Sequence, residues 1–189
     1  CGDLMQRMTM SGIKDWSDLD SILSRRIAAT GSYCDVIPLV NSYRQSQSVL
    51  AVARALYKDQ QGRPAPFSSQ SELSPFEPKP KLYVSSDEQS RITWVAEYIR
   101  SITEDYSEGV LPTIAVIVKN DEAVLALKDQ LQFEPAIQEC GIPVEACDQG
   151  RTIGRRSSVR IFSVEYIKGL EFESVIFHDI DSLQSSTSA

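Results

Sequence analysis

The last quarter of the chain contains the feature that most restricts its possible folds. Residues 159–181 read VRIFSVEYIKGLEFESVIFHDID. Two apolar runs rich in β-branched and aromatic residues, 159–164 and 174–180, flank a polar segment. Each run is as long as one buried strand of a parallel sheet, and such strands read as nearly continuous apolar runs. The polar segment contains Lys168 and Gly169, and we expect it at the carboxyl edge of the sheet, where ligands bind in open α/β folds.

The preceding residues alternate between strand and helix patterns. We predict strands at 35–40, 81–85 and 112–118, and a turn at 141–144 that leads into a further short strand. Helices are predicted at 15–29, at 46–58, from Ser86-Asp87 to about residue 105, and after Asn120-Asp121. This order predicts an α/β domain with a parallel sheet and right-handed crossovers. The expected apolar faces of the last two helices are Ile92, Val95, Ala96 and Ile99, and then Val124, Leu125, Leu127, Leu131 and Phe133.

Composition and charge exclude several classes of protein. A chain of 189 residues can bury the core of one sizeable domain. There is no apolar run of membrane-spanning length and no signal-peptide pattern, so we expect a cytoplasmic protein that does not contact a membrane. The formal net charge of −7 argues against a surface that coats nucleic acid, although a local basic groove remains compatible with it.

The four cysteines indicate no metal site. Cys1, Cys34, Cys140 and Cys147 are widely spaced, and zinc sites usually contain C-x-x-C pairs. We expect reduced thiols, with a disulfide between Cys140 and Cys147 as the less favoured alternative. The single His178 lies in a buried-looking strand and is expected to be a core residue rather than a catalyst.

Three segments are expected to lie outside regular structure. Residues 59–80 contain five of the nine prolines and are predicted to form a long surface loop. Residues 146–158 are also predicted to form a loop, and the tail at 182–189 is small, polar and expected to be disordered. The loop at 146–158 contributes to an arginine cluster that could contact DNA phosphates or simply be solvated: Arg151, Arg155, Arg156 and Arg160.

Three motifs in order resemble those of one protein family. Residues 163–172, SVEYIKGLEF, resemble motif V of the UvrD/Rep-like superfamily 1 DNA helicases, T-x-H-x-x-K-G-L-E-F, with K-G-L-E-F matched letter for letter. The segment IPLVNSYRQS at 37–46 resembles motif IV, L-x-x-N-Y-R-S. The opening residues CGDLMQ resemble motif III, G-D-x-x-Q, which is the weakest of the three matches.

The resemblance implies a fold and a domain organisation. Residues 35–181 would form the second RecA-like domain, a three-layer α/β domain with a mainly parallel sheet, and residues 182–189 its tail. Residues 1–34 would be the end of the first RecA-like domain, with motif III and a connecting helix. The chain begins with Cys1 rather than Met, so we expect it to be a piece of a longer protein. It contains no G-x-x-x-x-G-K-[ST] phosphate loop, which the first domain would supply.

The resemblance also implies a nucleotide site. Gln6 and Arg44 would act at the γ-phosphate, and Tyr43 would lie against the adenine. The guanidinium of Arg44 suits this role because it is always charged and binds phosphate oxygens in a fork. Gly169 and Glu171 would meet the sugar and phosphates. ATP and Mg²⁺ would be held mainly by the missing first domain.

Single-stranded DNA is the second ligand that the resemblance implies. Ser163 stands where the family has a DNA-contacting Thr, and Lys168 matches the family lysine; Arg155 and Arg156 are the candidates in the preceding loop. Two positions depart from the family pattern. Glu165 replaces a DNA-contacting His, and the aromatic residue that follows the motif III glutamine in the family is absent after Gln6.

The expected function is therefore that of an ATP-dependent DNA helicase or translocase. The chain would supply half of an ATP site between two RecA-like domains and part of the track for single-stranded DNA. The isolated chain is expected to be inactive. The alternatives are a helicase-like docking module without a motor, the helicase part of a helicase-nuclease, and an unrelated α/β nucleotide enzyme. For the last of these, a G-x-G-x-x-G turn is expected but absent.

Overall fold

The structure is a computed structural model that describes residues 41–42, 45–56, 68–69, 79–104, 112–151 and 157–184. The chain divides into two compact units, Cys1–Leu82 and Tyr83–Ala189. Each unit is described below by itself. The predicted helix at 15–29 and the predicted strand at 35–40 lie outside the described residues.

Within its described residues, the first unit contains one helix and a pair of short strands. β1 (Asn41–Ser42) pairs in parallel with β2 (Ser68–Ser69), which lies inside the segment predicted as a long loop. α2 (Gln47–Leu56) confirms the helix predicted at 46–58. Ser46 precedes the first turn, where its Oγ accepts a hydrogen bond from the Val49 N–H at 3.4 Å, as an N-cap residue does.

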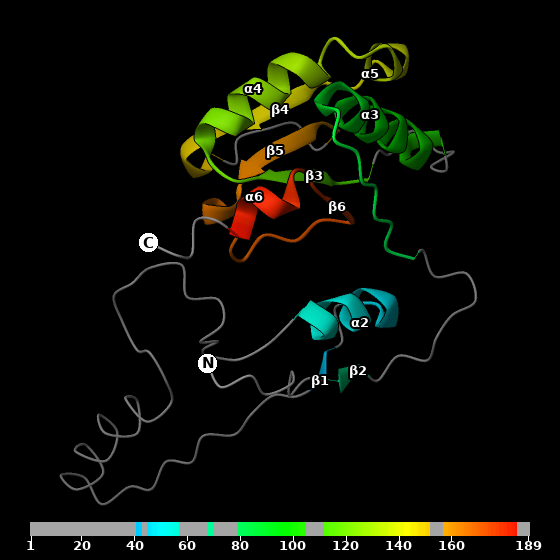
Figure 1. Cartoon of the computed structure of the whole chain (residues 1–189), viewed down its shortest axis with the longest axis vertical. Helices are drawn as coiled ribbons and strands as arrows, with labels where there is room; N and C mark the ends of the chain where they lie inside the picture. The colour runs from blue at the N-terminus through cyan, green and yellow to red at the C-terminus, as the bar shows by residue number, and fades with distance from the viewer. Residues whose placement is uncertain are drawn as a thin grey trace, which may run out of the picture. The chain divides into compact units, whose positions relative to one another are not determined.

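The second unit is built on a parallel sheet whose described strands follow the order β4-β5-β3-β6 (Figure 1). These strands are β3 (Ile114–Val118), β4 (Val144–Cys147), β5 (Val159–Ser163) and β6 (Ser174–Phe177). Their registers begin together, because Ile114 pairs with both Val159 and Ser174, and Val159 also pairs with Val144. The structure therefore confirms an α/β fold with a four-stranded, all-parallel sheet in this unit.

Three helices cover one face of this sheet: α3 (Glu88–Glu104), α4 (Asp121–Leu131) and α5 (Pro135–Cys140) (Figure 1). All four predicted core residues of α3 are buried, which confirms its apolar face. In α4, Val124, Leu127 and Leu131 are buried as predicted. Leu125 is 51% exposed because it follows Val124 by about 100° around the helix. Phe133 is 70% exposed because it lies beyond the helix end, so both of these core assignments were wrong.

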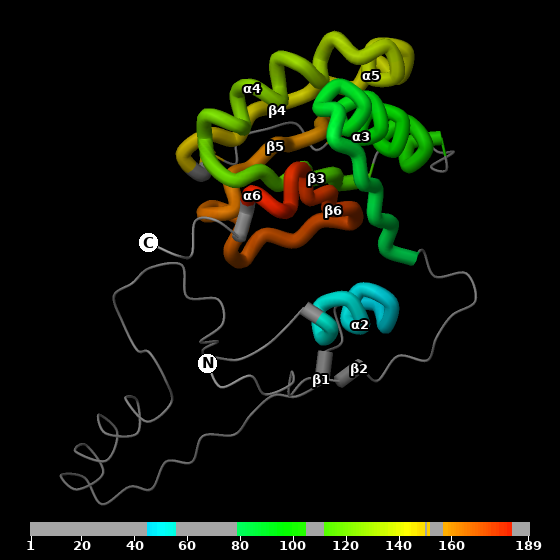
Figure 2. The backbone as a smooth tube through the Cα atoms, viewed as in Figure 1, coloured from blue at the N-terminus to red at the C-terminus, as the bar shows by residue number. Residues whose placement is uncertain are grey.

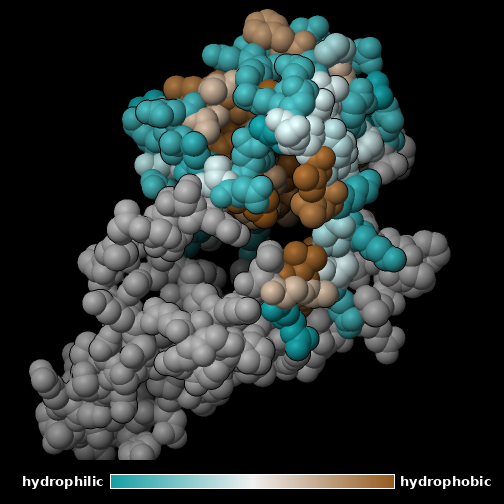
Figure 3. All heavy atoms as spheres, in the orientation of Figure 1, coloured by the Kyte–Doolittle hydropathy of each residue, from teal (hydrophilic) through white to brown (hydrophobic). Residues whose placement is uncertain are grey.

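The outward surfaces of these helices are polar. Figure 3 shows mainly hydrophilic residues over α3 and α4 on the visible face. This distribution is the expected result of an apolar stripe on each helix that faces the sheet, with charged residues on the opposite side. The core of the unit therefore lies between the helices and the alternate sheet residues that point toward them, Ile114, Val116, Val118, Val159 and Ile161.

The connection from β5 to β6 packs on the second face of the sheet, and its course between the two strands can be followed in Figure 2. This connection, residues 164–173, begins with the short 3₁₀ helix η3 (Val164–Tyr166). Four of its side chains, Val164, Ile167, Leu170 and Phe172, pack on a buried cluster formed by Ala115, Ile117, Cys147 and Phe162. The ring centroids of Phe162 and Phe172 are 5.4 Å apart. The polar segment expected between the two strands therefore has an apolar side that completes the fold.

Helix ends follow the predicted capping residues. Asp87 Oδ2 accepts hydrogen bonds from the Ser90 N–H at 2.7 Å and the Ser90 hydroxyl, and these bonds hold the pKa of Asp87 below its ordinary value. Asn120 Oδ1 accepts from the Ala123 N–H at 3.0 Å at the start of α4. Gly141 ends α5 with φ +64°, a left-handed conformation that favours glycine, and the chain then turns into β4 as expected.

Several predictions of secondary structure were wrong. The loop predicted at 146–158 begins later than expected, because residues 146–147 belong to β4 and Asp148–Gly150 form a short 3₁₀ helix. Residues 81–85 form no strand, and Leu82 and Val84 are more than 80% exposed, so they gain no burial from pairing. β6 ends at Phe177 and lies at the edge of the described sheet, where Val175 and Phe177 are about half exposed. Residues 182–184, which were expected in a disordered tail, belong to α6 (Ile180–Gln184).

Two further observations concern the expected environment of the protein. Cys140 and Cys147 are both free thiols, so the alternative of a disulfide between them is excluded in this structure. Within the described ranges, no helix combines the length and the apolar character needed to cross a membrane.

Candidate functional site

The carboxyl ends of β3 and β5 form the place where a ligand site is most expected. β3 ends at Val118 and β5 at Ser163, and these residues are register partners in adjacent strands. The chain leaves β3 toward α4 on the helical face, but it leaves β5 toward the connection on the second face. In open parallel sheets, ligands bind outside the carboxyl ends of two strands that diverge in this way. We call this place the β3–β5 edge.

Ser163 occupies the β3–β5 edge with its side chain turned inward. The residue is 1% exposed, and its Oγ accepts a hydrogen bond from the Glu165 N–H at 3.4 Å. The hydroxyl therefore caps η3, and the contact with DNA assigned to it stays a prediction. Glu165 is exposed on the next turn, so at this point of the edge a carboxylate, rather than the serine hydroxyl, faces solvent.

The K-G-L-E-F segment divides its side chains between two environments. Leu170 and Phe172 are partly buried against the second face of the sheet, whereas Lys168, Gly169 and Glu171 are exposed. A tight turn separates η3 from the rest of the segment, with the Leu170 N–H donating to the Ile167 carbonyl at 3.1 Å. The charged residues of the motif thus lie on its outer side because the apolar ones cover the sheet.

Gly169 has the backbone conformation that the turn requires. Its φ of +81° lies in the left-handed region, where a side chain costs free energy. A Cβ atom placed at Gly169 would meet no atom within 4 Å, so the glycine is required for its backbone angle and not to avoid a protein contact. The same open space leaves the backbone at this turn accessible to a phosphate or a sugar.

The far end of the connection is fixed to the start of β3. The Thr113 N–H donates to Glu173 Oε2 at 2.7 Å, and the Glu173 N–H donates to Thr113 Oγ1 at 3.0 Å. This reciprocal pair lies at the amino edge of the sheet, beside the first residues of β3 and β6. It fixes the position at which the motif V connection enters β6, so Glu173 has a structural role that its sequence position alone did not reveal.

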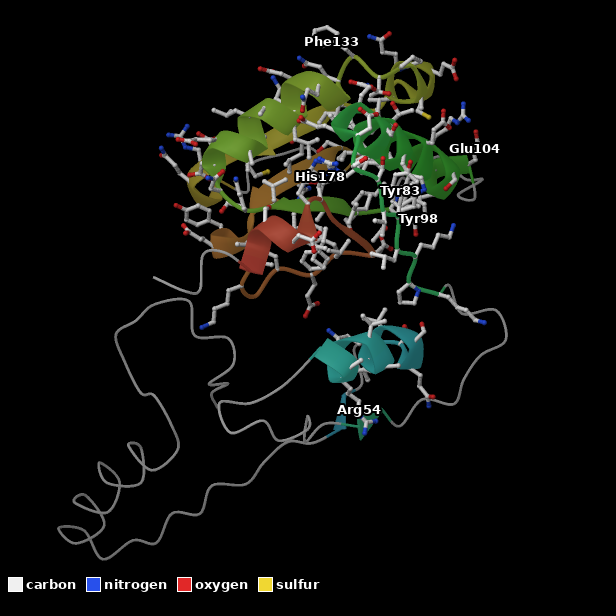
Figure 4. The ribbon with its side chains drawn as sticks, in the orientation of Figure 1. Arg54, Tyr83, Tyr98, Glu104, Phe133 and His178 are labelled. Atoms are coloured by element: carbon white, nitrogen blue, oxygen red, sulfur yellow. The ribbon has the colours of Figure 1, made fainter. Side chains whose placement is uncertain are left out.

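A second polar group lies at the carboxyl end of β6. His178 follows this strand, its N–H donates to the Ile117 carbonyl at 3.0 Å, and its side chain is only 10% exposed (Figure 4). The side chain is thus mostly buried as expected, although His178 follows β6 instead of lying within the predicted strand. Burial lowers the pKa of its imidazole, and the neighbouring Asp179 acts in the opposite direction. Arg91 of α3 connects this end of β6 to the helical layer, with its Nε 2.8 Å from Asp179 Oδ1.

The aspartate at position 179 is the one indirect sign of this second group that the sequence contains. Asp179 adopts φ +51°, and aspartate is among the few non-glycine residues that tolerate such a value. The pair His178-Asp179 therefore marks a sharp end to β6, where an uninterrupted strand to residue 180 was predicted. Arg91 could not be linked to Asp179 from the sequence, because the two residues are distant in the chain and only the crossing of α3 brings them together.

The cysteine at this edge is unsuited to chemistry. Cys147 ends β4, is 1% exposed and packs against the second-face cluster. Burial raises the pKa of its thiol to about 11, so the thiol stays protonated near neutral pH and is a poor nucleophile or metal ligand. In the described part of the chain, no group of three or more metal-ligating side chains comes together.

Five of the predicted site residues lie outside the described residues: Gln6, Tyr43, Arg44, Arg155 and Arg156. The other four belong to β5 and its connection to β6: Ser163, Lys168, Gly169 and Glu171. The structure thus brings together the motif V part of the predicted site. The roles of all nine residues stay predictions.

Comparison of the chain with models of protein families, with curated proteins and with solved structures finds no match. The function is therefore inferred from the sequence motifs and from the geometry of the β3–β5 edge.

Proposed function

We propose that this chain is the second RecA-like domain of a UvrD/Rep-like ATP-dependent DNA helicase. The observation that carries the proposal is the arrangement of the K-G-L-E-F segment. It follows the central strand β5, places Leu170 and Phe172 on the sheet, and leaves Lys168 and Glu171 exposed beside the open backbone of Gly169. A motif with both a packing side and a ligand side, next to the point where two parallel strands diverge, is what a nucleotide-dependent domain requires.

The residues of this chain would complete an ATP site whose phosphate loop and Mg²⁺ ligands belong to a preceding domain. Arg44 would bind the γ-phosphate and stabilise the negative charge that develops on it during transfer to water. Gln6 would contact the same phosphate, and Tyr43 would lie against the adenine. Glu171 would accept hydrogen bonds from the sugar hydroxyls. The open backbone around Gly169 is compatible with a nucleotide there, whereas the described residues offer no group of Mg²⁺ ligands, which the preceding domain would supply.

Movement along DNA would follow from closure of the cleft between the two domains. A ligand that bridges two domains favours the closed arrangement by its contacts with both, and its loss restores the open one. Lys168 would hold a phosphate of single-stranded DNA in this cycle, with Arg155 and Arg156 as further candidates. These contacts are electrostatic, so DNA binding should weaken steeply as salt increases.

ATPase activity of the full-length protein tests this proposal. The assay compares ATP hydrolysis with and without single-stranded DNA for the wild type, for Arg44→Ala and for Arg54→Ala. Arg54 is an exposed arginine of α2 and provides a matched control. We expect strong stimulation by DNA, and a loss of about 10³-fold or more in Arg44→Ala if the guanidinium stabilises the transferring phosphoryl group. ATP hydrolysis indifferent to both DNA and Arg44 would refute the proposal.

One observation favours a second candidate, a helicase-like docking module without a motor. Glu165 is exposed at the β3–β5 edge, where the family has a DNA-contacting His. A carboxylate repels the DNA backbone, so this position opposes the proposed track. A folded full-length protein with neither ATP hydrolysis nor DNA binding would support the docking module. A nuclease attached to the helicase would instead appear as DNA cleavage in the same samples.

A further inference from the structure

Three aromatic rings stack in a row along the start of α3. Tyr83 lies 5.1 Å from Trp94, and Trp94 lies 5.2 Å from Tyr98, with interplanar angles of 5° and 13°. Figure 4 shows Tyr83 and Tyr98 on the same side of the helix. Tyr83 is 40% exposed, so this row of rings reaches the surface instead of ending in the core. The helicase motifs do not use this row, and only Trp94 and Tyr98 of its three residues also pack against the core of the unit.

A shallow hollow of about 380 Å³ lies beside these rings. Its lining combines two aromatic rings with polar side chains from the first turns of α3: Tyr83, Gln89, Ser90, Thr93, Trp94 and Glu97. Glu97 is the one charged residue among these six. A hollow of this size, with an aromatic wall and a few polar groups, suits one side chain or one small planar group.

Two donors that line the hollow, those of Gln89 and Ser90, are already used within the domain, and Glu97, which contacts Arg100 through Oε2, is the one carboxylate that lines it. Gln89 Nε2 donates to Glu134 Oε1 at 2.6 Å, and the Ser90 hydroxyl donates to Asp87 Oδ2. The carboxylate of Glu97 can only accept hydrogen bonds when it is ionised. A guanidinium fits such a lining because it carries several N–H donors and no acceptor, and because its plane stacks on aromatic faces.

The charges beside the hollow also favour a cation. Arg100 contacts three carboxylates. Its Nη2 lies 2.5 Å from Glu97 Oε2, its Nη1 3.2 Å from Glu139 Oε2, and its Nε 3.7 Å from Glu104 Oε1. These four side chains carry an excess of negative charge, which attracts a cation and repels phosphate. A nucleic-acid strand is therefore disfavoured here, even though nucleobases can stack on tyrosine.

We propose that this hollow binds an arginine side chain presented by a partner protein. The guanidinium stacks on the exposed face of Tyr83 and pairs with the carboxylate of Glu97. This site is independent of the proposed helicase function, because it lies on α3 and uses none of the motif residues. It gives the domain a surface that selects partners with an exposed arginine, and the cation–π contact and the charge pair together supply the selectivity.

Nuclear magnetic resonance of the 189-residue chain tests this proposal with a small probe. The chain has two tryptophans, so the Trp94 indole N–H signal can be assigned by its loss in Trp94→Phe. The probe is N-acetyl-arginine amide, titrated into the millimolar range. Citrulline amide has nearly the same shape without the charge, and lysine amide has the charge without the planar group. We expect a saturable shift of the Trp94 signal with N-acetyl-arginine amide. The affinity for either analogue should be lower by at least about fivefold.

Three variants and one competitor decide the outcome. Glu97→Gln should weaken arginine binding by about fivefold. Glu104→Gln is the matched control: it also removes a carboxylate that contacts Arg100, but Glu104 does not line the hollow, so binding should be unchanged. Tyr83→Leu should abolish the shift while the circular dichroism spectrum is kept. Equal binding of citrulline, or equal effects of Glu97→Gln and Glu104→Gln, would overturn the proposal. A Trp94 shift produced by oligothymidylate and reversed by salt would also overturn it, in favour of a nucleic-acid surface.

Discussion

Phe162 provides the most direct test of how the second face of the sheet is built. Its side chain is fully buried at the centre of the cluster formed with Ala115, Ile117 and Cys147, under the motif V connection. Replacement of a buried Phe by Ala removes its transfer free energy and leaves a cavity, which together cost about 3–5 kcal/mol. Domains of this size are stable by only about 5–15 kcal/mol, so Phe162→Ala should lose much of its stability.

Urea denaturation followed by Trp94 fluorescence measures this loss in the second unit, with Trp16→Phe as the background. Phe133→Ala is the matched control, because Phe133 is 70% exposed and its loss should change the free energy of unfolding by less than about 0.5 kcal/mol. If Phe162→Ala is too unstable to measure, Phe162→Leu keeps most of the volume and should cost about 1–2 kcal/mol.

The same experiment extends to the helicase motif itself. Phe172 contacts Phe162 from the connection and is only partly buried, so Phe172→Ala should cost about 1–2 kcal/mol. The double variant should reveal a coupling of about 0.5–1.5 kcal/mol between the two rings. Equal costs for Phe162→Ala and Phe133→Ala would refute the packing of the second face. A coupling near zero would show that the motif V connection does not lie on the sheet as described.

Three further predictions concern single positions. Asn120→Ala removes the cap of α4 and should lower the free energy of unfolding by about 1 kcal/mol, whereas Asn120→Asp should keep it in the same urea assay. Gly169→Ala forces a side chain into φ +81° and should cost about 1 kcal/mol, with a smaller cost for Gly169→Asn; equal costs would contradict a backbone origin. Burial lowers the pKa of His178, so the unfolded chain binds its proton more readily and stability should fall as the pH drops below 6.5 toward the folded-state pKa. This fall should be smaller in His178→Gln, measured from urea midpoints between pH 7.5 and pH 5, and an unchanged slope would exclude His178 as its source.

The helical face was predictable because each of its elements carries a local signal of its own. The apolar spacing of α3 identified Ile92, Val95, Ala96 and Ile99, and all four are buried. The continuous apolar run of β3 and the capping residues Asp87 and Asn120 were equally informative. In each case the pattern depends on neighbours a few residues away, which the sequence displays directly.

The errors occurred where the outcome depends on distant neighbours. Residues 81–85 alternate like a strand, yet the described structure offers them no partner strand, and Tyr83 instead stacks on Trp94. The apolar run at 174–180 looks buried throughout, but β6 lies at the edge of the described sheet and keeps only Ile176 in the core. The helix α5 was not predicted because its six residues are too few to display a period.

The candidate site was predictable only in part. The polar residues between the two strands were expected at the carboxyl edge, and the structure places Ser163 at the end of β5 and the K-G-L-E-F turn on the connection that begins there. The burial of the Ser163 hydroxyl was not foreseen, because a serine at a strand end gives no sign of which way it points. The reciprocal bonds between Thr113 and Glu173 join residues 60 positions apart, a pairing that only the folded sheet defines.

The connection over the second face has a consequence for how its sequence can change in length. From residue 170 to residue 174, partly buried and exposed side chains alternate, and both ends of the connection are fixed, one by the cap of η3 and the other by Thr113. Insertion or deletion of one residue would exchange the two sets, turning Leu170 and Phe172 toward solvent and Glu171 toward the sheet. Substitutions can therefore alter the chemistry of the outer side, whereas the fold fixes the number of residues between Ser163 and Ser174.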